Sequence, residues 1–358
     1  ITLSFQMLKP LILRADTGNV SGYKQLIEKT IKVLSKHYDL IVLPVFYEKN
    51  NCEGYKKINK KNWNCPELYL SPMSNDEHLS FLGDFTVKNN CFLYTMWESS
   101  RLTRYQKKEC LPFSKILVPS KWNKECFDRE GFNVETLPCF VDEEVYYEKT
   151  KKDNSSFYFL AGGSHLIANG NSKRKDFSML LRVFRKIFKD KKDVKLKIKL
   201  SDCDYLKRPL FLDDKIQFFN NFDCEIDYAA FLGTCDCFVS VSKSEGWGFM
   251  QIESLATGKP LIAPLYSGVT EFANLENTFP LRFEEDIALA SWGSGGGMWA
   301  NVEEESLEEQ LLNVYNKRDE IRHNSYKYSN SVISKFSLKQ YENNLINFLE
   351  QNYSLYQG

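Results

Sequence analysis

Two glutamates that flank a glycine turn are the clearest functional candidates in this chain. Glu245 and Glu253 have seven residues between them, and the turn Gly246–Gly248 falls in that interval. The apolar run 236–242 predicts a buried strand before the turn, and a short amphipathic helix is expected after it. Backbone N–H groups and the dipole at a helix N-terminus favour a phosphate there. Because Glu253, about one turn into the helix, can accept hydrogen bonds from two sugar hydroxyls, the segment predicts a nucleotide-sugar site.

Patterns typical of strands and of helices alternate in both halves of the chain. Strands are expected at 10–14, 40–45, 91–96, 115–119, 157–160, 195–200, 217–219 and 261–264, and helices at 23–37, 177–188 and 337–352. Residues 16–22 are predicted as a flexible turn and residues 48–67 as a polar loop. This alternation predicts an α/β fold of doubly wound sheets with ligands at the carboxyl ends of the strands.

The segment around the two glutamates resembles the retaining glycosyltransferases of family 4, which have the GT-B fold. Ser244–Gly248 matches the Ser-Glu-Gly-x-Gly string of that family, and Gly258–Pro260 matches the Gly-x-Pro that follows it. Ser267–Phe272 resembles the Gly-x-x-Glu turn that meets the donor, and the resemblance runs from about residue 90 to residue 275. It implies donor contacts from Gly163, Lys173, Gly246, Trp247, Gly248, Phe249, Glu253, Gly268 and Glu271.

The resemblance also implies a division into domains, and the length of 358 residues is enough for two cores. We expect a first, acceptor-side Rossmann-like domain at 1–147 and a second, donor-binding one at 148–335, facing each other across a cleft. The helix within 336–358 is expected to cross back onto the first domain, as such helices do in GT-B enzymes.

Two cations before the helix at 177 are candidates for holding a leaving diphosphate. Lys175 matches the lysine of the family's Arg…Lys pair. The second cation stays open between Arg174 and His165, because Ser164 and His165 stand where relatives often have arginine. Together with Glu245, Lys175 and Arg174 are the predicted catalytic residues, although a bare run of cations is more often a solvated face.

The acceptor side is predicted from a second stretch of the resemblance, Met96–Leu102. Glu98 and Arg101 are its candidate residues, and Glu98 stays open between an acceptor contact and a buried ion pair. Gly18 and Gly22 belong to a glycine-containing loop that in relatives faces the donor diphosphate. The four histidines do not match the family's position for an acceptor-side histidine, so the group that orients the acceptor hydroxyl is unassigned.

Composition argues against several other classes of function. Lys and Arg total 47, as do Asp and Glu, so the chain has no net positive charge that would favour binding to nucleic acid. Ten scattered cysteines indicate reduced thiols and a cytosol-like compartment. No apolar run reaches the length of a membrane-spanning helix and no signal peptide is expected, which is compatible with a cytoplasmic protein that contacts a membrane peripherally.

The resemblance implies transfer of a sugar, with retention, from a UDP- or GDP-sugar to a glycan, lipid-linked or protein acceptor. It implies neither a cofactor nor a divalent metal, with side-chain cations in the metal's place and attack from the face that the diphosphate leaves. One alternative is an inactive nucleotide-sugar- or glycan-binding module, and another is a GT-B phosphorylase or hydrolase. A third, a metal-dependent transferase, would use Asp202 and Asp204.

Overall fold

The computed structural model describes residues 8–15, 21–43, 65–71, 88–149, 155–163, 174–200, 214–220, 222–288 and 297–354. The chain divides into two compact units. The first comprises Ile1–Trp97, Leu102–Cys139 and Lys339–Gly358, and the second comprises Glu98–Arg101 and Phe140–Leu338. The short stretch Glu98–Arg101 therefore belongs to the second unit although the residues on either side of it belong to the first.

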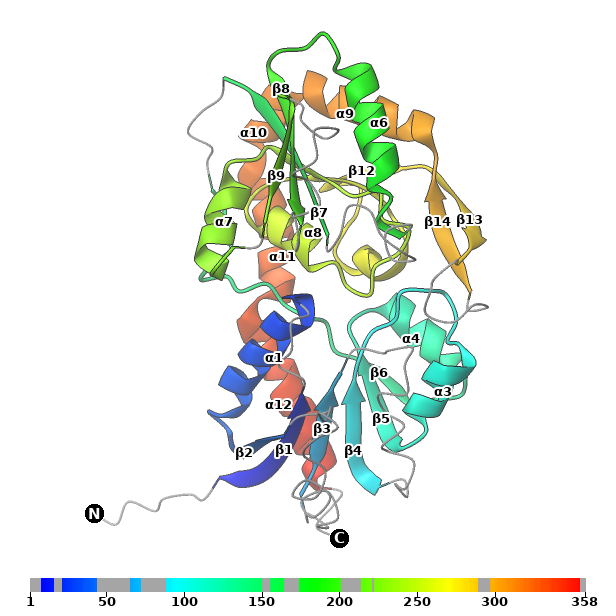
Figure 1. The fold of residues 1–358 in the computed structure, drawn as a ribbon. Coiled ribbons are helices and arrows are strands. Elements are labelled where there is room, and N and C mark those ends of the chain that lie inside the picture. Colours follow the sequence, from blue (N-terminus) through cyan, green and yellow to red (C-terminus); the bar gives the residue numbers. More distant parts are fainter. Residues whose placement is uncertain are drawn as a thin grey trace, which may run out of the picture. The chain divides into compact units, whose positions relative to one another are not determined.

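A parallel six-stranded sheet with the order β2-β1-β3-β4-β5-β6 forms the core of the first unit (Figure 1). Its strands are β1 (Lys9–Ala15), β2 (Tyr38–Leu43), β3 (Glu67–Leu70), β4 (Lys88–Tyr94), β5 (Phe113–Val118) and β6 (Val134–Thr136). The inner strands carry side chains that are buried on both faces, such as Leu11–Leu13, as expected of a parallel sheet covered by helices.

Strand β3 was not predicted, and its first residue falls within the predicted loop 48–67. The strand is only four residues long and begins with a charged residue, Glu67. It nevertheless lies in the middle of the sheet, between β1 and β4. Arg14 on β1 donates to the buried Glu67 carboxylate at 2.9 Å, which is the pairing that a buried charge requires.

The helices of the first unit are α1 (Ser21–Leu34), α3 (Arg104–Cys110), α4 (Lys121–Asp128) and α12 (Leu338–Ser354). Helix α1 begins at Ser21, so the last two residues of the predicted turn 16–22 are helical. Helix α12 lies beside α1 (Figure 1), and the hydroxyls of Thr30 and Tyr341 are 2.8 Å apart. Its Phe348 ring packs edge-on against Phe92 of β4, so α12 is part of the core of this unit.

A second parallel sheet, with the order β12-β11-β10-β7-β8-β9, forms the core of the second unit. Its strands are β7 (Phe157–Gly163), β8 (Val194–Leu200), β9 (Ile216–Phe219), β10 (Cys237–Val239), β11 (Leu261–Pro264) and β12 (Thr278–Leu281). The chain runs from β7 outward through β8 to β9 and then returns to place β10 on the other side of β7. The boundary between β7 and β10 is thus a topological switch point, where open α/β sheets bind their ligands. The predicted α/β alternation is confirmed.

The second unit also contains helices and a hairpin that were not all anticipated. The helices are α6 (Phe177–Ile187), α7 (Glu225–Gly233), α8 (Phe249–Ala256), η4 (Ser267–Glu271, a 3₁₀ helix), α9 (Glu304–Asn316), α10 (Arg318–His323) and α11 (Ser325–Phe336). The antiparallel hairpin of β13 (Phe283–Ile287) and β14 (Met298–Val302) was not predicted. Within the described segments, no helix combines the length and apolarity needed to cross a membrane.

Candidate functional site

The predicted donor segment lies at the switch point of the second sheet. Gly163 is the last residue of β7, and a Cβ on it would lie 3.1 Å from the Phe177 ring and 3.6 Å from the Lys175 side chain. Strand β10 ends at Val239, earlier than the predicted strand 236–242. The following residues leave the sheet and turn toward α8, so the cations after β7 and the glutamates after β10 meet at one edge.

The glycine turn is held by close backbone packing against η4. The Gly268 N–H donates to the Glu245 carbonyl at 2.9 Å, and the Glu245 N–H donates to the Ser267 hydroxyl at 2.8 Å. A Cβ on Gly268 would lie 2.6 Å from the Gly246 carbonyl carbon, closer than real Cβ contacts. Gly248 caps α8 with a φ of +100°, a conformation that favours glycine. These contacts place Glu245 beside the N-terminus of α8.

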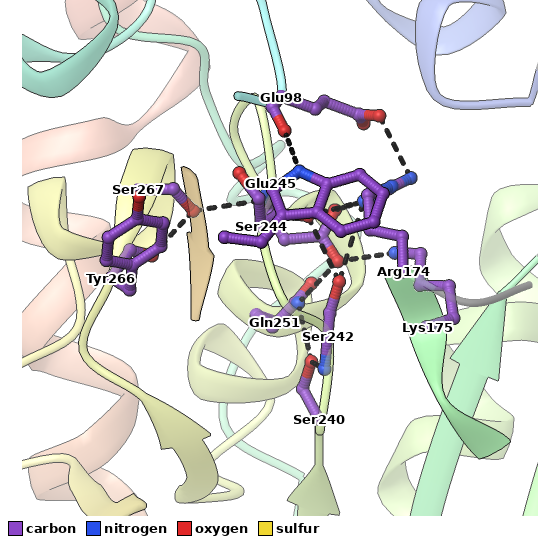
Figure 2. A network of polar contacts seen from close by, with 11 residues as sticks. Glu98, Arg174, Lys175, Ser240, Ser242, Ser244, Glu245, Gln251, Tyr266 and Ser267 are labelled. Carbon is purple, nitrogen blue, oxygen red and sulfur yellow. Dashed lines mark hydrogen bonds and ion pairs between the residues drawn. The ribbon is translucent and has the colours of Figure 1, made fainter. Parts of the chain in front are cut away.

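Arg174 and Lys175 both converge on Glu245 (Figure 2). Arg174 Nη1 is 3.2 Å from the Glu245 carboxylate and donates to the Ser244 carbonyl at 2.5 Å, while Lys175 forms a short ion pair with the other Glu245 oxygen. Burial by itself would raise the pKa of the Glu245 carboxyl. The Lys175 ammonium and the Arg174 guanidinium outweigh burial and lower that pKa to about 2. Glu245 is therefore a carboxylate at any physiological pH.

Glu98 is the second carboxylate on Arg174. Its oxygen lies 3.1 Å from Arg174 Nη2, and the Gly246 N–H also hydrogen-bonds it. Burial raises the pKa of the Glu98 carboxyl, and the Arg174 guanidinium opposes this effect only in part. Although protein atoms surround the Glu98 carboxyl, its side chain is 35% exposed, compared with 10% for the side chains of Glu245 and Arg174. Of these three side chains, that of Glu98 is thus the most exposed and the freest to move away.

Glu253 lies on α8 and is 3% exposed. The hydroxyl of Tyr146 donates a hydrogen bond to it, and burial together with this carboxylate raises the tyrosine pKa. Tyr228 of α7 packs edge-on against Tyr146, with ring centroids 6.4 Å apart. The Tyr228 hydroxyl, which is buried and also near Glu253, has no hydrogen-bond partner among the described residues. Two buried tyrosine hydroxyls therefore lie near Glu253.

Other residues predicted to contact the donor lie in the same region but differ in how deeply their side chains are buried. The Trp247 side chain is 1% exposed and packs against Phe272 and Phe336, at 5.1 and 5.6 Å between ring centroids. This is a packing position. Phe249 at the start of α8 and Glu271 at the end of η4 are both partly exposed.

Two acceptor-side candidates, Gly22 and Arg101, belong to different units. Gly22 is the second residue of α1 in the first unit, and Arg101 is exposed within the stretch Glu98–Arg101 of the second. Other residues considered from the sequence, Gly18, Lys173, Ser164, His165, Asp202 and Asp204, lie outside the described residues. In the part of the chain that is described, no three side chains of His, Cys, Asp or Glu gather as a metal site.

Sequence reasoning missed several polar residues that complete the network. The Gln251 amide donates to Glu245 at 3.3 Å and to the Ser240 hydroxyl at 3.2 Å, and the Ser242 hydroxyl is 3.5 Å from Arg174 Nη1. All three residues lie inside the segment that had been singled out, so their polarity within an otherwise apolar stretch was the available signal. Tyr146 gave no such signal, because only the fold brings it to Glu253.

The chain is similar to glycosyltransferases in one segment of its sequence. Residues 166–280 match the family described as glycosyl transferases group 1. This segment includes β10, the glycine turn, α8 and η4. A search of curated proteins gave no match.

Solved structures resemble the chain over most of its length. Sucrose-phosphate synthase from Thermosynechococcus elongatus has a TM-score of 0.71 at 11% identity, with 97% of this chain and 100% of that chain covered. HepE from Anabaena, solved with UDP and glucose, has a TM-score of 0.62 at 12% identity, with 96% and 99% covered. The pneumococcal O-GlcNAc transferase GtfA, solved with UDP and GlcNAc, has a TM-score of 0.60 at 13% identity. The match covers 84% of this chain but only 59% of GtfA. These likenesses confirm the predicted GT-B fold.

Proposed function

We propose that the protein is a retaining glycosyltransferase that moves a sugar from a UDP- or GDP-sugar to a hydroxyl of a glycan, lipid-linked or protein acceptor. The observation that carries this proposal is the convergence of Arg174 and Lys175 on Glu245 at the switch point, beside the N-terminus of α8. The match of residues 166–280 to glycosyl transferases group 1 supports it independently.

The two cations and the helix would bind the donor diphosphate. Arg174 and Lys175 supply positive charge from side chains that are mostly buried, and the α8 N-terminus adds its dipole. Cationic side chains in a site of low dielectric stabilise a leaving diphosphate more strongly than they would in water. Glu245 would keep both cations in place between turnovers, and no divalent metal is then needed to neutralise the leaving group.

The second glutamate would hold the nucleoside end of the donor. Glu253 accepts a hydrogen bond from Tyr146, and because one carboxylate can accept several hydrogen bonds, ribose hydroxyls would also bind it. UDP is the first nucleotide to test, since GtfA and HepE were both solved with UDP.

Transfer would proceed on one face of the donor sugar. The bond between the anomeric carbon and the phosphate oxygen breaks while the acceptor oxygen bonds to the same carbon from the same side. The acceptor's proton passes to the departing phosphate oxygen, so no carboxylate nucleophile is required. Configuration at the anomeric carbon would be retained.

The test is release of nucleoside diphosphate from a panel of UDP- and GDP-sugars by wild type and by Lys175→Ala, with and without chelator. One donor should be cleaved by wild type, and loss of one electrostatic stabiliser should lower that rate roughly 10²- to 10³-fold. Unchanged rates in chelator would support metal independence. Tight binding of a donor with no release even when glycan acceptors are supplied would instead favour a binding module.

A further inference from the structure

Strand β14 holds the stretch Glu98–Arg101 within the second unit. The Trp299 indole N–H donates to the Glu98 carbonyl at 2.7 Å, and the Met298 N–H donates to the Ser100 hydroxyl at 2.8 Å. Gly297, with φ of +93°, packs so closely that a Cβ on it would lie 2.6 Å from the Arg101 nitrogen. The backbone of Glu98 is therefore fixed, whatever its carboxylate does.

The same strand is connected to the backbone of Arg174. The Ala300 N–H donates to the Lys243 carbonyl at 2.9 Å, and the Lys243 N–H donates to the Arg174 carbonyl at 2.8 Å. Strand β14 thus sets both the Glu98 backbone and the Arg174 backbone, and Figure 2 shows the Glu98 carboxylate reaching the Arg174 guanidinium.

The charges of this network already balance when no sugar nucleotide is bound. Arg174 and Lys175 are positive, and Glu98 and Glu245 are their two carboxylate partners. A diphosphate would bring further negative charge to a mostly buried place, which costs free energy unless a carboxylate leaves.

Glu98 is the carboxylate that can leave. Glu245 is bonded by Lys175, Arg174 and Gln251, and its backbone is fixed by η4. Glu98 contacts one side-chain cation and the Gly246 N–H, and more than a third of its side chain is exposed at 35%. Guanidinium and backbone N–H groups are also among the hydrogen-bond donors that bind phosphate oxygens.

We infer that the Glu98 carboxylate occupies the position of a donor phosphate oxygen on Arg174 and the Gly246 N–H, and that the donor displaces it. This inference rests on the proposed function and adds an order to it. The backbone carbonyl of Glu98 stays bonded to Trp299, and the released carboxylate accepts a hydrogen bond from a hydroxyl of the acceptor other than the one that attacks. The donor therefore binds before the acceptor. The sequence left open whether Glu98 contacts the acceptor or forms a buried ion pair. In this inference it does both, one after the other.

The first experiment compares UDP and GDP binding to wild type and Glu98→Gln by titration calorimetry at one fixed ionic strength. Because glutamine lacks the competing charge, the nucleotide that binds wild type should bind Glu98→Gln roughly threefold to tenfold more tightly. Turnover of the cleaved donor should fall in the same variant. A merely structural role would weaken binding and turnover together, and that result, or unchanged affinity, would overturn the inference.

Two further variants separate the alternatives. Glu125→Gln removes an equal charge from an exposed position on α4, and it should change neither nucleotide affinity nor turnover. Trp299→Phe keeps an aromatic ring at this position but removes the N–H that donates to the Glu98 carbonyl, so turnover should fall while nucleotide affinity stays equal or rises. Loss of affinity in a Trp299→Phe protein with an unchanged melting temperature would contradict the anchoring role. If neither UDP nor GDP binds wild type or Glu98→Gln, the proposed function fails along with the inference.

Discussion

Glu245 joins the two cations of the site, and its ionisation is coupled to folding. Burial favours the neutral acid, but Lys175 and Arg174 prevail and lower its pKa from 4.5 to about 2. A carboxyl group with a lower pKa in the folded state stabilises that state above its unfolded pKa, and the effect is lost as pH falls through the folded value.

We therefore expect the free energy of unfolding of wild type to exceed that of Glu245→Gln above about pH 4.5, by a margin that shrinks toward pH 2. Urea denaturation of both proteins across that range measures it. Glu98, whose pKa is raised, contributes the opposite slope, so the two proteins compared must differ only at Glu245. A margin that does not change with pH would show that the ion pairs contribute no pH-dependent stability.

The hydroxyl of Tyr146 gives a second prediction for a single residue. Tyr146→Phe removes the hydrogen bond that orients Glu253, and UDP binding should weaken roughly twofold to tenfold. Tyr228→Phe is the matched control, since its hydroxyl has no partner among the described residues and its loss should leave affinity unchanged. Equal effects of the two changes would mean that packing of the rings, not the hydrogen bond, supports Glu253.

At the scale of elements, the contact between η4 and the glycine turn supports the site. Gly268→Ala would push a methyl group against the Gly246 backbone, which should destabilise the fold by about 1–3 kcal/mol and move Glu245. UDP affinity should fall with it. Gly131→Ala, at φ +83° with nothing within 4 Å, strains the backbone elsewhere and should lower the melting temperature without changing affinity.

Elements with simple patterns could be predicted, and elements defined by distant contacts could not. The apolar residues of β7 and the glycine that caps α8 were sufficient to predict a strand and a helix start. Strand β3 is only four residues long and begins with Glu67, and β13 carries three exposed acidic residues, so neither has a long apolar run. The pairing of Glu98 with Arg174 joins residues far apart in sequence, and no local propensity encodes it.

At the scale of the whole molecule, α12 is the part of the chain that completes the first unit. Its Leu345 is fully buried, so Leu345→Ala should cost about 2–5 kcal/mol. Because Leu345 belongs to the first unit, the loss should appear in a melting transition that UDP does not shift, whereas UDP should raise the transition of the second unit. Leu312→Ala, at a site on α9 that is 39% exposed, is the control and should have little effect on either transition. One shared transition would mean that the units unfold together.

The position of α12 in the chain also bears on how the protein is made. Protein synthesis delivers residues in order, at about 5–20 per second, and domains fold as they emerge. The second unit is complete at Leu338, whereas the first needs Tyr341 and Phe348 to cover Thr30 and Phe92. On the ribosome the second unit can therefore finish first, and the apolar face of β4 must wait uncovered, open to chaperones, until the ribosome has translated the last turns of α12.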